Sequence, residues 1–253
     1  MHFLTNNSEQ VILGTKTQET QETQETQETQ ETQDVQHGQT LKRDVEALAA
    51  QEKFPLDKLF VIDGSKRSSH SNAYFLGLPW GSKQIVIYDT LIAQSKNVKE
   101  VVAVLGHEIG HWYLSHTTKL LVINQAHIFS IFTLFSAFVK NKSLYNSFGF
   151  YNEYPILIGF MLFGDVLKPT DAIMGFLMNL LSRTYEYQAD AYATKLGYGK
   201  ELKVSLITLH KENLGALNVD WLYSAYSYNH PHLTERINYI DEVEQKLKLE
   251  KKE

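Results

Sequence analysis

The sequence predicts a mainly α-helical α+β fold with a small β-meander and two candidate transmembrane helical segments. Three observations lead to this prediction. Apolar residues recur at helical spacing in several segments, three short apolar runs are separated by turn residues, and two long apolar tracts lie in the second half of the chain. The chain has 253 residues, which is enough for one sizeable domain with its own core.

Composition excludes several classes of function. Cysteine is absent, so thiolate metal sites, disulfide scaffolds and cysteine nucleophiles are excluded, and any metal site must use His, Asp or Glu. The formal charge is −5, but five Glu and one Asp lie between Thr17 and Asp34 with no Lys or Arg. Without these six negative charges the chain carries +1. Because there is no basic excess, nucleic acid is not expected as a partner.

The N-terminal region differs in composition from the rest of the chain. The triplet Thr-Gln-Glu repeats five times after Lys16 and offers no apolar face at any period. Such a segment buries too little apolar surface to offset the entropy of ordering it. Residues 1–40 are therefore predicted to be a disordered, low-complexity tail ahead of a domain over residues 41–249.

The domain is predicted to open with a short amphipathic helix after Thr40, which is a suitable N-cap. Pro55 ends this pattern, and the three apolar runs of the meander follow, separated by turns that contain Gly and Ser. The runs lie at residues 59–62, 73–76 and 85–88, and further helices are expected over residues 97–118, 182–196 and 237–249.

Two apolar tracts are candidates for membrane segments. Residues 120–139 carry no formal charge over a length that crosses a hydrocarbon core of about 30 Å. A membrane span is favoured, with a buried helix of a soluble domain as the alternative, because three polar residues lie near one end. Residues 155–181 are interrupted by three charges and Pro169, which favours two shorter helices or a pair of half-spans lining a cavity. The bilayer is accordingly an expected partner.

A metal-binding motif lies within the helix expected at residues 97–118. His107, Glu108 and His111 form an H-E-x-x-H pattern, so both imidazoles lie on one helix face and can bind one zinc ion. Glu108 lies about 100° around the helix, where it can address the metal-bound water. Glu186, on another helix, is the candidate third ligand. Asp190, one turn later, is expected to hydrogen-bond a ligating histidine. This arrangement is typical of a zincin-type metalloprotease core.

Five segments, in this order along the chain, carry a family pattern: Ser71–Pro79, Lys83–Leu91, Val104–Trp112, Ser182–Tyr198 and Asn229–Ile237. Together they resemble the type-1 CAAX prenyl protease family of membrane zinc peptidases, and the likeness is nearest to fungal members. The resemblance covers about Pro55 to Lys246. The E-Y-Q-A-D sequence that follows H-E-x-x-H at this distance separates this family from other zinc peptidases.

The resemblance implies a zinc endopeptidase that removes the last three residues of prenylated CAAX proteins, as a multi-pass protein of the endoplasmic reticulum membrane. It implies that Glu108 is the general base and that Asn72 and Arg236 contact the substrate. It also places His230 against the active site. From the residues alone, two interpretations of His230 stay open: a donor that stabilises the oxyanion, or a turn histidine before Pro231.

The N-terminal part of the chain departs from the family pattern. Relatives carry further membrane spans ahead of the β-strands, whereas this chain has the repeat and one short helix, so an N-terminally truncated product or a misassigned start is expected. Two alternative functions stay open beside the prenyl protease. The missing spans favour a catalytically silent membrane fragment, which predicts zinc binding without turnover. An HtpX-like quality-control membrane protease is the other alternative, because it shares H-E-x-x-H and the third Glu. A preference for prenylated peptide over unfolded protein would exclude the HtpX-like alternative.

Overall fold

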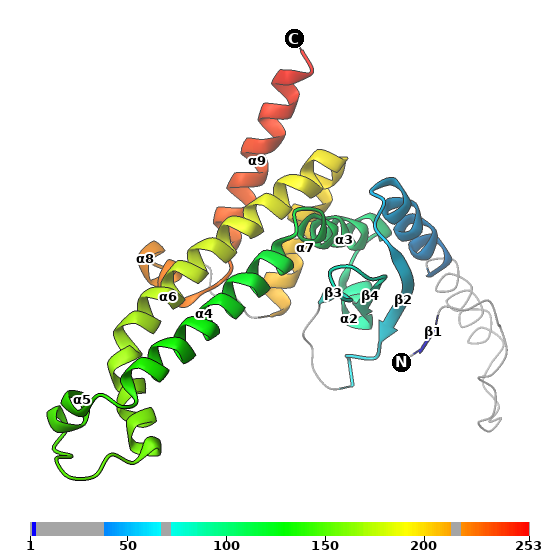
Figure 1. Ribbon diagram of the computed structural model, residues 1–253. Helices are drawn as coiled ribbons and strands as arrows, with labels where there is room; N and C mark the ends of the chain where they lie inside the picture. The colour runs from blue at the N-terminus through cyan, green and yellow to red at the C-terminus, as the bar shows by residue number, and fades with distance from the viewer. Residues whose placement is uncertain (1, 4–37, 67–71, 214–218, 253) are drawn as a thin grey trace, which may run out of the picture. The chain divides into compact units, whose positions relative to one another are not determined.

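The computed structural model describes residues 2–3, 38–66, 72–213 and 219–252 (Figure 1). Most of the predicted N-terminal tail, residues 4–37, lies outside the described residues. Contacts divide the chain into two compact units, and helix α6 contributes to both. Unit 1 comprises Met1–Tyr113, Gln188–Leu217 and Leu233–Glu253, and unit 2 comprises Leu114–Tyr187 and Asn218–His232.

The predicted α+β class is confirmed, but the predicted meander is wrong. In the part of the chain that the structure describes, unit 1 holds a sheet with the strand order β1-β2-β4-β3, in which β4 runs parallel to β2 and antiparallel to β3. The physical reason is the burial of β4, since Ile85, Val86 and Ile87 are at most 2% exposed and such a strand takes a central position. The strands are His2–Phe3 (β1), Leu56–Ile62 (β2), Ala73–Leu76 (β3) and Lys83–Tyr88 (β4).

Helix α3 is the central helix of unit 1. It is apolar nearly all round from Val101 to Leu105, and a helix with that pattern is buried on all sides. One side of α3 packs with Ile85 and Ile87 of the sheet, and α3 also contacts α7, which in turn contacts α9. The helices are residues 38–51, Asp89–Gln94 (α2), Val98–Tyr113 (α3), Gly199–Glu212 (α7) and Leu233–Glu250 (α9), with a π-helix at Thr194–Tyr198.

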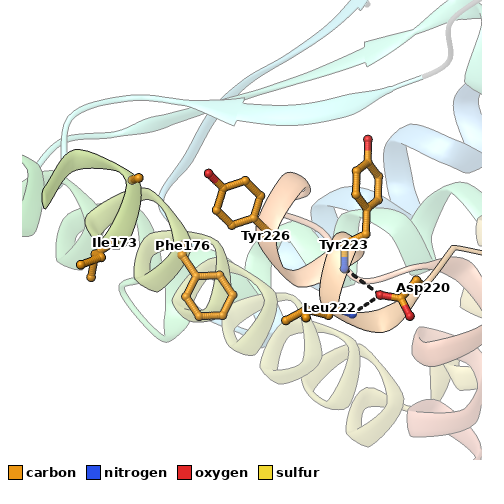
Figure 2. A pocket seen from close by; sticks show the side chains of 7 residues that line it. Ile173, Phe176, Asp220, Leu222, Tyr223 and Tyr226 are labelled. Carbon is orange, nitrogen blue, oxygen red and sulfur yellow. Dashed lines mark hydrogen bonds between the residues drawn. The ribbon is translucent and has the colours of Figure 1, made fainter. Parts of the chain in front are cut away.

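Unit 2 is built on an antiparallel pair of long helices, α4 and α6, which lie side by side in Figure 1. His116 near the start of α4 stacks on Tyr185 near the end of α6, with ring centroids 4.1 Å apart. At the other end Phe135 lies 5.6 Å from Phe163. The short helix α8 is capped by Asp220, which accepts from two backbone N–H groups (Figure 2). The helices are His116–Phe138 (α4), Lys142–Ser147 (α5), Ile156–Ala193 (α6) and Trp221–Ser227 (α8).

Helix α6 differs from the prediction, because residues 155–181 form neither two shorter helices nor half-spans. One helix of 38 residues runs through Pro169 and includes most of the separate helix expected at 182–196. A proline removes one backbone hydrogen bond and bends a helix without necessarily ending it. The neighbouring charges are exposed, and Lys168 pairs with Asp165 at 2.6 Å. The helix expected over 97–118 instead breaks at Ser115, whose φ is +57°.

One helix among the described residues is long and apolar enough to cross a membrane. This helix is α4, and none of the side chains in its most apolar window is buried. The second predicted segment, within α6, does not meet the same criterion of length and composition. The structure therefore supports one of the two candidate membrane segments.

Candidate metal centre

Gly110 lets α3 approach the last turns of α6 closely. A Cβ atom on Gly110 would lie 3.0 Å from Cβ of Tyr192 and 3.2 Å from Cα of Ala189, which is closer than most Cβ contacts, so α6 would have to move by a few tenths of an ångström. A Cβ atom on Gly106 would lie 3.7 Å from Cβ of Ala193, an ordinary contact. The glycine inside the H-E-x-x-H motif thus brings the histidine face of α3 against α6.

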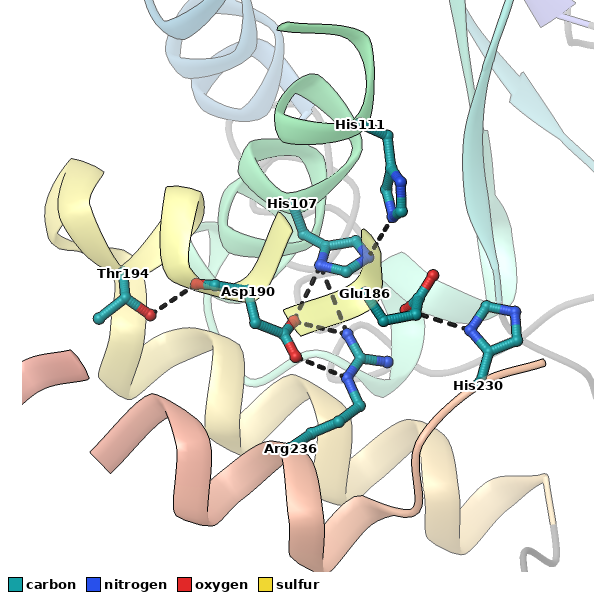
Figure 3. Close-up of polar contacts among 7 residues, drawn as sticks. All are labelled: His107, His111, Glu186, Asp190, Thr194, His230 and Arg236. Atoms are coloured by element: carbon teal, nitrogen blue, oxygen red, sulfur yellow. Dashed lines mark hydrogen bonds and ion pairs between the residues drawn. The ribbon is translucent and has the colours of Figure 1, made fainter. Parts of the chain in front are cut away.

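The two histidines of the motif face each other, as expected for positions four residues apart on a helix. Nε2 of His107 lies 3.1 Å from Nε2 of His111 (Figure 3). His107 is buried and His111 is half-buried. Two imidazole nitrogens bound to one tetrahedral zinc ion lie about 3.3 Å apart, given Zn–N distances of about 2.0–2.1 Å. The observed separation fits shared coordination of one ion.

Asp190 and Arg236 orient His107. Oδ1 of Asp190 lies 2.9 Å from Nδ1 of His107. Because a carboxylate only accepts, this contact assigns the ring proton to Nδ1 and leaves the lone pair of Nε2 for a metal. Arg236 on α9 donates to both carboxylate oxygens of Asp190, at 2.8 Å and 2.6 Å.

Asp190 is charged although it is fully buried. Burial acts to raise the pKa of Asp190, but the adjacent Arg236 guanidinium and the N–H of His107 outweigh it and hold this pKa below its usual value. The carboxylate therefore accepts a hydrogen bond from the Nδ1–H of His107 across the neutral pH range.

Glu186 lies one turn before Asp190 on the same helix, so the continuity of α6 fixes its position relative to Asp190. Its side chain is buried. Among the described residues, one ligand atom each from His107, His111 and Glu186 all lie within 4.8 Å of one another. Two neutral imidazoles and a carboxylate, with no thiolate, form a donor set that suits zinc and leaves a coordination position for water or substrate.

His230 contacts Glu186. The residue that holds His230 in place, Arg183, was not predicted from the sequence. Nδ1 of His230 lies 3.1 Å from Oε2 of Glu186, and 58% of the His230 side chain is exposed. Arg183 is buried on α6, and its Nη1 donates to Oγ of Ser224 at 2.8 Å and to the backbone oxygen of His230 at 3.2 Å. The sequence offered one signal of this role: an arginine, Arg183, lies three residues before the candidate ligand Glu186.

The other predicted residues lie as follows. Glu108 is half-buried on α3 between the two histidines of the motif. Asn72 directly precedes β3; its side chain is exposed, and its Oδ1 accepts from the N–H of Ala73 at 2.8 Å. The two bonds from Arg236 to Asp190 give this arginine a supporting position beside His107. Substrate contacts by Asn72 and Arg236 stay predictions.

Comparisons with known proteins agree on one family. The model of peptidase family M48 matches residues 36–244. A protein of Saccharomyces cerevisiae named CAAX prenyl protease 1 is 52% identical over 222 residues, which cover 82% of this chain and 49% of that protein. The human CAAX prenyl protease 1 homolog is 40% identical over 242 residues, covering 81% and 51%.

A solved structure gives the same relationship. The crystal structure of S. mikatae Ste24p superposes with a TM-score of 0.72 at 52% sequence identity, over 79% of this chain and 50% of that one. The chain spans about half the length of the curated relatives it matches. These findings confirm the resemblance drawn from the sequence, and the chain belongs to peptidase family M48.

Proposed function

We propose that this chain is a zinc endopeptidase that removes the last three residues of prenylated CAAX proteins. The observation that carries the proposal is the convergence of His107, His111 and Glu186 within 4.8 Å around an H-E-x-x-H helix. The names of the relatives, which are 40–52% identical, support the substrate class.

His107, His111 and Glu186 would hold the zinc ion. A bound zinc ion supplies Lewis acidity, which polarises a peptide carbonyl and lowers the pKa of water. Asp190 accepts a hydrogen bond from the Nδ1–H of His107 and so keeps Nε2 available and more basic. Arg236 holds Asp190 in place, which fixes the orientation of the ring.

Glu108 is the proposed general base. It accepts a proton from the attacking water and returns it to the amine that leaves when the peptide bond breaks. His230 is the proposed donor to the developing oxyanion, because its ring is exposed and lies beside the candidate zinc ligand Glu186. Arg183 would position His230 by binding its backbone oxygen.

Membrane association is a further part of the proposal. Helix α4 has the length and composition of a span, and its side chains in that window are not buried by the rest of the chain. Prenylated substrates partition into the bilayer, so a membrane-inserted protease meets them there. The endoplasmic reticulum location and the multi-pass topology rest on the resemblance to the CAAX prenyl proteases.

The test is hydrolysis of a farnesylated CAAX peptide by the purified full chain, with metal content determined on the same samples. Glu108→Gln should abolish cleavage while the zinc content stays at one ion per chain, since Glu108 is not a ligand. Glu212→Gln, a change of an exposed carboxylate on α7, is the matched control and should cleave at the wild-type rate.

Two results would refute the proposal. Zinc binding by the wild-type chain without any cleavage would favour the catalytically silent fragment. Cleavage of unfolded protein in preference to the farnesylated peptide would favour a quality-control protease.

A further inference from the structure

An apolar groove lies between α6 and α8, entirely within unit 2. Its volume is about 600 Å³, which is within the usual range of small-molecule sites. Three aromatic rings and aliphatic side chains line it, and Figure 2 shows Phe176 of α6 beside the rings of α8. The one charged lining group, Asp220, accepts from the N–H groups of Leu222 and Tyr223 and is thereby occupied as a helix cap.

The face of α6 that lines the groove continues along the helix towards Glu186. Ala172, Phe176, Asn179 and Arg183 recur at spacings of three and four residues and so share one face of the helix. Phe176 packs against Tyr226 with ring centroids 6.3 Å apart, and Nδ2 of Asn179 donates to the backbone oxygen of Tyr226 at 2.6 Å.

The same face of α6 ends at the candidate metal centre. Arg183 binds Ser224 of α8 and the backbone oxygen of His230, whose ring contacts Glu186. Contacts along one helix face therefore connect the groove to a candidate zinc ligand. Ten residues of helix separate Phe176 from Glu186, a distance of about 15 Å at 1.5 Å per residue.

We infer that the α6–α8 groove binds the isoprenyl chain of the substrate, with the thioether end towards Glu186. This inference rests on the proposed function. An extended farnesyl chain is about as long as the distance from the groove to Glu186, and its flat alkenes pack well against aromatic faces. An apolar chain gains free energy by leaving water for a lining that is mostly apolar.

The first test is photocrosslinking in phospholipid nanodiscs. The probe is an S-farnesyl CAAX peptide with a diazirine on the terminal isoprene unit, added to the full chain that carries Glu108→Gln. Crosslinks should map to residues 172–176 and 221–226, and unlabelled S-farnesyl peptide should compete. Crosslinks only to α4, or equal competition by an S-palmitoyl peptide, would overturn the inference in favour of a general lipid surface.

The second test fills the groove. Ala172 is exposed on α6, so Ala172→Trp adds bulk to the groove without disturbing a packed core. Leu177→Trp is the matched control, because Leu177 is an exposed residue of the same helix that does not line the groove. Ala172→Trp should raise the Kd of the S-farnesyl peptide about tenfold or more, through the loss of two or three buried methylene contacts. The Kd of a shorter S-geranyl peptide should rise less, and Leu177→Trp should change neither value more than about twofold.

The outcomes separate this inference from the proposed function. Normal cleavage with an unchanged KM in Ala172→Trp would refute the groove and leave the peptidase standing. Specific crosslinking to the groove without any cleavage by the wild-type chain would refute the peptidase and leave the binding site standing.

Discussion

Arg236→Met tests the buried network behind His107. The side chains of Arg236 and Asp190 are 12% and 0% exposed and share two bonds, at 2.8 Å and 2.6 Å. Loss of Arg236 leaves the Asp190 carboxylate charged in the core without its guanidinium partner, although His107 still donates to it, and this costs about 3–5 kcal/mol. In an Asp190→Asn background no charge is stranded, and the same change should cost only about 1 kcal/mol, the value of an ordinary hydrogen bond.

The assay is a double-mutant cycle from the free energies of unfolding of the full chain by urea in detergent solution. The expected coupling between Arg236→Met and Asp190→Asn is about 2–4 kcal/mol. Zinc affinity, measured by competition with a chelator, should fall about tenfold or more in each single variant, because the orientation of His107 is lost. Two single changes that add within about 0.5 kcal/mol would refute the reasoning, since independent sites behave in that way.

Three further predictions follow from packing, from a polar link and from an ion pair. Gly110→Ala should destabilise the chain by about 1–3 kcal/mol, measured by thermal unfolding, and should weaken zinc binding. Gly106→Ala is the control: its new methyl group meets only ordinary contacts, so the stability should stay unchanged or rise slightly. Arg183→Met should increase amide exchange in α8 about tenfold or more, because two charge-assisted hydrogen bonds are lost; unchanged exchange would show that these bonds do not hold α8. Burial acts to lower the pKa of Lys203, but Asp241 and Glu244 outweigh it and raise this pKa above 10.5. The charged Lys203 therefore contributes its full stability below pH 10.5, and that contribution is lost as the pH rises through the higher pKa of the folded state. Urea unfolding between about pH 9 and 12 should show this loss in the wild type and a smaller one in Lys203→Met; equal slopes would contradict the assignment.

The sequence predicted the parts of the site that follow from short-range spacing. The positions of His107 and His111 on one helix face follow from the helical period, and the step from Glu186 to Asp190 follows in the same way. Glu186 was chosen as the third ligand because Asp190 follows it one turn later on the same helix face, where it can hydrogen-bond a ligating histidine, and the resemblance agreed with that choice. The contact of Asp190 with Arg236 joins two distant helices and was visible only in the structure.

The errors in the fold have physical causes. Apolar runs identify strands but carry no information on their order, although the unbroken run Ile85-Val86-Ile87 favoured a central strand over the edge of a meander. Pro169 and the charges beside it suggested an interruption in α6. The helix continues there because proline costs one hydrogen bond and the charged side chains lie at the surface.

The most direct test of the central claim is the zinc stoichiometry and affinity of the wild-type chain beside its His107→Ala, His111→Ala and Glu186→Gln variants, with Glu212→Gln as control. If the three residues share one ion, the wild type and the control bind one zinc per chain, and each of the three variants loses affinity by at least about a hundredfold. Retention of wild-type zinc affinity by Glu186→Gln would contradict the claim that this carboxylate completes the metal centre.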